Sequence, residues 1–263
     1  MNILGRSIPH IIIISVLALL ANDVLTVSTE ISLSSILGLH SIYSQQFHFY
    51  QLLTYMFMHG GYMHLFFNMF ALWMFGLPLE LRLGMRRFAY YFLISGIGAA
   101  LIHLGVLAYQ HHKLITDLKT FVSEPTPEHL KKLAEKIPIF NPEAIVEYES
   151  LWNSGQMPKQ YLESFVTSVV HAVERYIDIP TVGASGAVFA ILLAFGVLYP
   201  NATILLFFFI PIKAKYFVIL YGIVELWLGL TNLPNDPIAH FAHLGGMIWG
   251  GILLYYWKRK GVI

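Results

Sequence analysis

Residues 182–199 read VGASGAVFAILLAFGVLY, an apolar run that contains one serine and no charged residue. Five other stretches of the chain also approach the ~20 residues that span a hydrocarbon core. The six stretches cover roughly residues 9–27, 52–77, 88–109, 182–199, 214–231 and 240–257. They predict an all-α membrane protein with a bundle of six transmembrane helices.

The overall composition supports the same class of protein. Of the 263 residues, 57% are hydrophobic and only 12% are charged, and the mean hydropathy is +0.64. A soluble domain carries about 25% charged residues. The chain has no cysteine, which excludes disulfides and thiolate metal sites. A net charge of +1 gives no sign of a nucleic-acid partner, so the expected surroundings are a lipid bilayer.

Lysine and arginine in short loops mark the cytoplasmic side of a membrane protein. The short connections 28–51 and 232–239 contain neither residue. The basic residues beside the expected spans are Arg6, Arg82, Arg86, Arg87, Lys213, Lys215, Lys258, Arg259 and Lys260. They fall on one side if both termini are cytoplasmic. The first apolar run lacks a convincing cleavage site, so we expect it to be a retained helix. We expect the membrane to be a bacterial cytoplasmic membrane.

A polar, acidic insertion separates the third and fourth expected spans, over residues 110–180. Thr126 and Asn141 each precede a proline and a glutamate, a pattern typical of helix starts. Gly155 is expected to end the second helix, and residues 159–177 have the spacing of a third. The chain therefore divides into residues 1–112, an extracytoplasmic helical insertion over 113–180, and residues 181–263.

A serine and a histidine lie at similar expected depths in two of these spans. Ser185 follows Pro180 by five residues, which places it ~7 Å into a helix that starts at the proline. His243 follows Pro237 by six residues, ~9 Å by the same rise. An isolated serine in a membrane helix usually bonds to a carbonyl one turn earlier. Matched depth favours a shared site for these two residues.

Small residues around both positions allow their helices to approach closely. Gly183 and Gly186 flank the serine, and Gly246 and Gly250 form a Gly-x-x-x-Gly after the histidine. Close approach brings a serine and a histidine on separate helices within hydrogen-bond distance. His240 lies three residues before His243 and competes with it for the role of base; the depths alone do not decide between them.

The second expected span carries further polar residues. His64 and Asn68 are four apart and share one helical face. Ionisable groups inside a membrane are costly and are functional candidates by default. The alternative is that these side chains only hold neighbouring helices together through hydrogen bonds.

Several short motifs together resemble the rhomboid family of intramembrane serine proteases. Gly183-Ala184-Ser185-Gly186 resembles the family's Gly-x-Ser-Gly, which implies that Ser185 is the nucleophile. Ala242-His243-Leu244-Gly245-Gly246 resembles Ala-His-x-x-Gly, which assigns the base to His243 and leaves His240 as a neighbour.

Two motifs on the second span extend the resemblance. His64 and Asn68 match the family's His-x-x-x-Asn, which implies that they line an oxyanion hole with the backbone N–H of Ser185. Glu80-x-Arg82-x-Gly84 resembles the motif that closes this helix. The resemblance covers most of residues 45–112 and 181–260.

The chain departs from the family pattern at three places. Tyr50-Gln51 stands where many relatives have Trp-Arg, and Phe189 where a tyrosine is common one turn after the serine. The 110–180 insertion has no counterpart in the minimal fold. We expect the Phe189 ring to stack on the imidazole of His243 and to orient it, in a supporting role with Gly183, Gly186 and His240.

The expected reaction is peptide hydrolysis by a Ser185–His243 dyad, without a cofactor or metal. Asp236 lies in the preceding loop and Glu225 belongs to the fifth span, so no carboxylate is expected beside the imidazole. Substrates would be transmembrane helices that unwind near their outer end, because an intact helix hides its carbonyls. The site would open to the outer face.

Two other functions compete with this prediction. One alternative is an intramembrane metalloprotease, which the spacing His240-x-x-His243 and the twelve histidines suggest. The usual His-Glu-x-x-His motif is absent, however. A catalytically inactive rhomboid-like protein that binds membrane helices, or a transporter, is the non-enzyme alternative.

Overall fold

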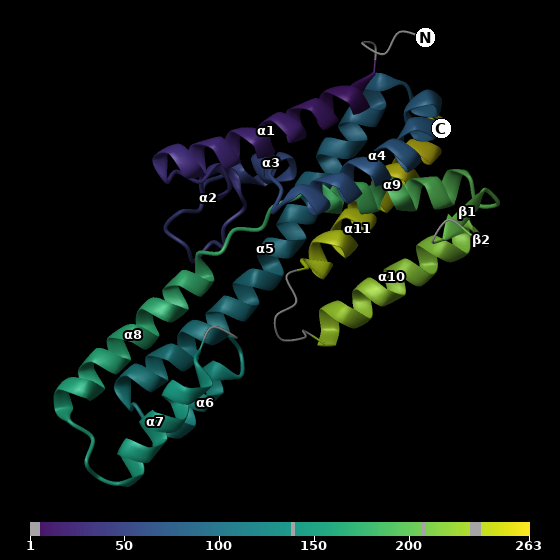
Figure 1. The fold of residues 1–263 in the computed structure, drawn as a ribbon. Helices are drawn as coiled ribbons and strands as arrows, with labels where there is room; N and C mark the ends of the chain where they lie inside the picture. Colours follow the sequence, from purple (N-terminus) through teal and green to yellow (C-terminus); the bar gives the residue numbers. More distant parts are fainter. Residues whose placement is uncertain (1–5, 138–139, 207–208, 232–237) are drawn as a thin grey trace.

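The structure is a computed structural model that describes residues 6–137, 140–206, 209–231 and 238–263. Almost all of the ordered elements are helices, and one short hairpin accompanies them (Figure 1). The long helices are α1 (Ser7–Thr29), α4 (Tyr62–Leu83), α5 (Met85–Ser123), α8 (Lys159–Ile177), α9 (Ser185–Leu198), α10 (Ala214–Thr231) and α11 (His240–Arg259). The shorter elements are α2 (Leu33–Leu37), α3 (Gln51–Thr54), η2 (Tyr55–Phe57), α6 (Pro127–Ala134), α7 (Pro142–Asn153), β1 (Thr203–Leu206) and β2 (Ile210–Lys213).

Several of these helices are suited to cross a membrane. Among the described residues, α1, α4, α5 and α10 are long and apolar enough to do so, and α9 is apolar but shorter. With its 14 residues α9 falls below the ~20 that span a hydrocarbon core. The protein is therefore a multi-pass, all-α integral membrane protein, with fewer clear spans than the six expected.

Helix α9 lies at the centre of the membrane bundle, in contact with α4, α5, α10 and α11. A Cβ atom added to Gly246 would lie 1.8 Å from the carbonyl oxygen of Gly186, and one added to Gly250 would lie 2.8 Å from Cβ of Ala190. Only glycine permits such contact between α9 and α11. The expected approach of two small-residue faces is thus present in the structure.

The second expected span, over residues 52–77, begins later than the apolar run indicates. Residues 51–57 form the short helices α3 and η2, and α4 starts at Tyr62 after Gly61. Gly61 has a φ of 154°, a conformation that side chains rarely adopt. The α4 helix then runs to Leu83, beyond the expected end at 77.

The Glu80/Arg82/Gly84 motif holds helix ends together, far from Ser185. Glu80 accepts a hydrogen bond of 2.5 Å from the backbone nitrogen of Ser7 at the start of α1. Arg82 donates from Nη1 to the carbonyl oxygen of Leu198 at the end of α9, over 3.3 Å. Gly84, with a φ of 80°, turns the chain from α4 into α5.

The insertion forms a helical bundle of its own on an extension of α5. This helix runs unbroken for 39 residues, so the expected boundary between residues 112 and 113 lies inside it. Helices α6, α7 and α8 pack against the extension, and the bundle projects away from the membrane helices (Figure 1). Thr126 and Asn141 cap α6 and α7 as the sequence predicts, through bonds of 3.3 Å and 2.9 Å.

The core of this bundle is separate from that of the membrane helices. Its fully buried side chains come from all four helices and include Phe121, Leu130, Leu133, Tyr148 and Val173. Neither the antiparallel hairpin of β1 and β2, which pairs Thr203 with Lys213 before α10, nor the short helix α2 was expected from the sequence.

Candidate active site

Ser185 is the first residue of α9. The preceding segment is held in place by backbone bonds: Thr181 pairs with Leu39, and the Gly183 nitrogen donates to the Tyr55 carbonyl over 2.9 Å. The expectation that Ser185 lies ~7 Å inside a helix starting at Pro180 is therefore wrong, because residues 181–184 are not helical. The backbone N–H of Ser185 instead belongs to the first turn, where N–H groups have no intrahelical partner.

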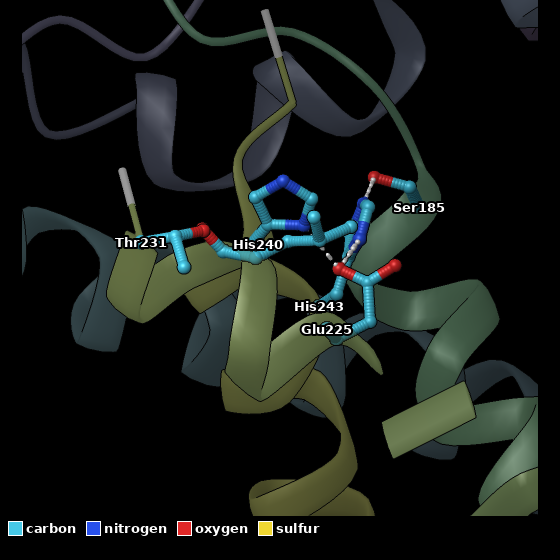
Figure 2. Close-up of polar contacts among 6 residues, drawn as sticks. Ser185, Glu225, Thr231, His240 and His243 are labelled. Carbon is cyan, nitrogen blue, oxygen red and sulfur yellow. Dashed lines mark hydrogen bonds and ion pairs between the residues drawn. The ribbon is translucent and has the colours of Figure 1, made fainter. Parts of the chain in front are cut away.

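His243 is the fourth residue of α11, about 4.5 Å along it rather than ~9 Å, because the helix begins at His240. Its Nε2 lies 2.8 Å from Oγ of Ser185 (Figure 2). Both residues thus lie near the first turn of their helices. The two groups are in hydrogen-bond contact, which is the geometry that a general base and its nucleophile require.

A carboxylate lies behind the imidazole, which the sequence analysis did not expect. Oε2 of Glu225, from α10, is 2.9 Å from Nδ1 of His243 and 2.7 Å from Nδ1 of His240 (Figure 2). The carboxylate only accepts hydrogen bonds, so each Nδ1 carries the proton. His243 then presents the lone pair of Nε2 to the Ser185 hydroxyl. The expectation of a dyad without a carboxylate is corrected: three side chains are connected in series.

Three side chains behind Ser185 are buried, those of Glu225, His240 and His243. Glu225 is 4% exposed, His240 5% and His243 8%. Hydrogen bonds between ionised and polar groups are stronger where water is excluded. The single acidic residue inside the apolar run 214–231 was the signal that could have identified Glu225, because an intramembrane carboxylate is a functional candidate.

Phe189, one turn after Ser185, covers one face of the His243 ring. The two ring centroids are 4.1 Å apart and the planes differ by 7°, which is a parallel stack. Tyr221 of α10 packs on the same phenylalanine with centroids 5.0 Å apart. The imidazole is therefore fixed by a hydrogen bond at each nitrogen and by an aromatic ring on one face.

His64 reaches the site from α4. A Cβ atom added to Gly183 would lie 2.9 Å from Nε2 of His64 and 3.8 Å from Oγ of Ser185. Gly183 also has a φ of 126°, so a side chain at this position would be strained and would collide with His64. Gly186 is likewise confined, since its added Cβ would lie 2.6 Å from Cβ of Ala99.

Asn68 is on the same face of α4, one turn further. Its amide nitrogen donates to the backbone oxygen of His64 over 2.9 Å, and the residue is buried. The structure therefore brings Ser185, His243, Phe189 and His64 together. The oxyanion role of His64 and Asn68 stays a prediction.

The same centre contains a set of possible metal ligands. Glu225, His240 and His243 each offer one ligand atom, and these atoms lie within 4.8 Å of one another. Sequence spacing paired the two histidines but missed the acidic member, because Glu225 precedes them by 15 and 18 residues on another helix.

Comparison with known proteins gives one family. The family model described as Rhomboid domain matches residues 46–116 and 159–260, which leaves α6 and α7 outside the match. An uncharacterized mitochondrial rhomboid protein of Schizosaccharomyces pombe is 36% identical over 86 residues, 30% of this chain and 22% of the relative. The chain thus matches about a fifth of that relative's length. No solved structure matches the chain.

Proposed function

The chain belongs to the rhomboid family, and from that premise we propose that it is an intramembrane serine endopeptidase. The observation that carries the proposal is the 2.8 Å contact between Oγ of Ser185 and Nε2 of His243. Membership of the family alone leaves room for inactive relatives, so the proposal depends on this pair and on the groups around it.

In the proposed reaction His243 takes the proton of Ser185 as the hydroxyl oxygen attacks the scissile carbonyl, and then donates that proton to the leaving amine. Water attacks the acyl group in the second half of the reaction, with the same histidine as base. Glu225 keeps the proton on Nδ1 and stabilises the imidazolium that forms, as the carboxylate of a triad does.

The negative charge that develops on the substrate carbonyl would meet the backbone N–H of Ser185 at the first turn of α9. The positive end of the α9 dipole adds to this stabilisation. His64 and Asn68 would supply side-chain donors after a rotation of the Asn68 amide. One such donor contributes roughly 2.7–4 kcal/mol to the transition state.

The proposed substrates are membrane proteins whose transmembrane helices unwind at the site, since a helical backbone hides its carbonyls. For the membrane topology we propose six spans, with α9 and α11 completing the four clear candidates, and with both termini on the cytoplasmic side. The site and the bundle of α6–α8 would then face outward, from a bacterial cytoplasmic membrane.

Two measurements test the activity. Reconstituted protein should cleave a labelled transmembrane substrate and react at Ser185 with a fluorophosphonate probe, while Ser185→Ala should do neither. Ser95→Ala is a matched control, because Ser95 is equally a membrane serine but is fully buried on α5. Cleavage that survives in Ser185→Ala would refute the proposal, and a wild type that neither cleaves nor labels would favour an inactive relative or a transporter.

The topology has its own test. Because the chain contains no cysteine, single cysteines can be introduced near Arg6, in the α6–α7 connection and after α11. Thiol reagents that do not cross membranes should reach only the second of these from the outer side. Labelling of all three from one side would contradict the topology.

A further inference from the structure

The carboxylate of Glu225 lies buried in a membrane helix without a lysine or arginine partner in the described part of the chain. Its ion-pair partners among the described residues are both histidines, His240 and His243. A buried charge is expensive unless it is paired. Here two imidazoles converge on one oxygen of the carboxylate. A small cation bound between the same three side chains would also balance the charge of the carboxylate.

We propose that Glu225, His240 and His243 bind a divalent transition-metal ion of the Zn²⁺ type, and that the bound ion inhibits the proteolysis proposed above. The inhibitory half rests on the proposed function, whereas the binding half does not. The metal would act as a regulator of the serine site and not as its catalyst.

The donor atoms suit zinc. Two imidazole nitrogens and one carboxylate oxygen form a ligand set that zinc sites in proteins use, with a fourth position left for water. The ligand atoms already lie within 4.8 Å of one another. Bonds of about 2.0–2.1 Å would set the ligand atoms roughly 3.4 Å apart. The two oxygen–nitrogen distances of 2.7 and 2.9 Å would therefore lengthen slightly as the ion replaces the Nδ1 protons, which requires small side-chain rotations and no new ligand.

Inhibition follows from the position of the protons. Without metal, Nδ1 of His243 holds the proton and Nε2 offers its lone pair to Ser185. A metal on Nδ1 takes the lone pair of that atom, so the single proton of the neutral ring must move to Nε2. Nε2 would then donate a hydrogen bond to Ser185 and could not accept the hydroxyl proton. The ion also neutralises the negative charge of Glu225, which would otherwise stabilise the imidazolium.

His240 separates the two roles, because it faces Glu225 and not Ser185. Its Nδ1 is 2.7 Å from Oε2 of Glu225, and its ring meets that of His243 edge-on with centroids 6.3 Å apart. Removal of His240 should therefore weaken metal binding more than it affects the serine. Each variant's inhibition is expressed relative to its own metal-free rate.

Binding is tested first on the full-length Ser185→Ala protein in detergent, so that activity plays no part. Co²⁺ should give the visible absorption of a four-coordinate site, and Zn²⁺ should displace it in a one-to-one ratio. The additional change His240→Ala should raise the metal concentration for half-saturation at least tenfold. His103→Ala is the control, since this buried histidine bonds to Thr181 instead. A Co²⁺ signal that is absent, or equal in all three proteins, would overturn the site.

Inhibition is tested on the active protein with the fluorophosphonate probe, after preincubation with buffered free Zn²⁺. Labelling of Ser185 should fall at least tenfold over the range that saturates the site, and a chelator should restore it. The variant His240→Ala should need at least tenfold more Zn²⁺ for the same loss.

The outcomes separate the two proposals. Labelling that continues while the site is saturated would refute inhibition. Labelling that requires metal would also refute it, and cleavage that requires metal without labelling of Ser185 would favour a metalloprotease. If metal-free wild type never labels, the serine-protease proposal fails, while Co²⁺ binding to the Ser185→Ala protein still decides the metal site.

Discussion

Replacement of Glu225 tests whether this carboxylate assists the Ser185–His243 pair, a role that the sequence did not predict. The carboxylate stabilises the imidazolium of His243 through one charge-assisted hydrogen bond of 2.9 Å. A bond of this kind contributes about 1.5–3 kcal/mol. At 1.36 kcal/mol per tenfold in rate, its loss should lower kcat by roughly 10–150-fold. Because Glu225 faces away from Ser185, KM should change little.

The structure also orders two substitutions at this position. Both Nδ1 groups converge on the same oxygen of Glu225. Glu225→Gln can place its carbonyl oxygen there, keep the proton on Nδ1 and lose only the charge. Glu225→Ala removes the acceptor as well, so the ring is free to adopt the wrong tautomer. In serine proteases an amide in place of the carboxylate can impose the wrong tautomer, at a cost of roughly 10⁴-fold. Glu225→Gln avoids that cost when its carbonyl oxygen faces both Nδ1–H groups, so Glu225→Ala should be the slower variant.

Steady-state cleavage of a reconstituted transmembrane substrate measures both values, and thermal unfolding confirms that each variant is folded. Tyr221→Phe is a matched control one turn earlier on α10, because it keeps the ring that packs on Phe189 and removes only the hydroxyl. If folded Glu225→Gln and Glu225→Ala both retain kcat within twofold of wild type, Glu225 does not orient His243. The dyad with ring stacking alone would then be the correct description.

Three further outcomes are expected. Loss of the parallel stack in Phe189→Leu should cost ~0.5–1.5 kcal/mol and lower kcat about 2–12-fold, whereas Phe195→Leu on the same helix should not; equal effects would point to general packing. Gly246→Ala places a carbon against backbone and should abolish the folded protein or lower its Tm strongly, while Gly105→Ala, which meets nothing within 4 Å, should be tolerated; a stable Gly246→Ala would contradict the close helix contact. Burial alone raises the pKa of Asp117, but its two lysine partners outweigh burial and hold the pKa below the ordinary value. That carboxylate therefore stabilises the α6–α8 bundle above its unfolded-state pKa and loses the contribution as pH falls through the lower folded-state pKa; hydrogen exchange from pH 7 to about 3 should show this loss, and a flatter response in Asp117→Asn.

The sequence identified the helices of the insertion well because their signals are local. Thr126 and Asn141 followed by proline satisfy the free N–H groups of a first turn, and the structure shows those bonds. The start of α9 was predicted too early, and the depth of His243 was counted from Pro237 although α11 begins at His240. Apolar residues at 182–184 continue the hydropathy of the span, but Thr181 pairs with Leu39 and Gly183 bonds to Tyr55, so the backbone there follows long-range partners.

The candidate site was predictable where one short motif contains the residue. Ser185 and His243 lie in such motifs, and small residues indicated that their helices approach each other. Glu225 could not be placed in this way, because its distance from His243 depends on how α10 packs against α11 and no spacing rule records that. Its charge inside an apolar span was visible, but the partner of that charge was not.

The continuity of α5 fixes the distance between the α6–α8 bundle and the membrane helices. A helix of 39 residues measures about 58 Å, almost twice the ~30 Å thickness of a hydrocarbon core. Its lower half contacts α9 and α11, and its upper half forms part of the core with Leu130 and Tyr148. In the proposed orientation this helix is a rigid connection between the bilayer and the α6–α8 bundle. A protein bound to that bundle would therefore be held at a set distance from the bilayer. A lateral force on that protein would act, through α5, on the helices around Ser185.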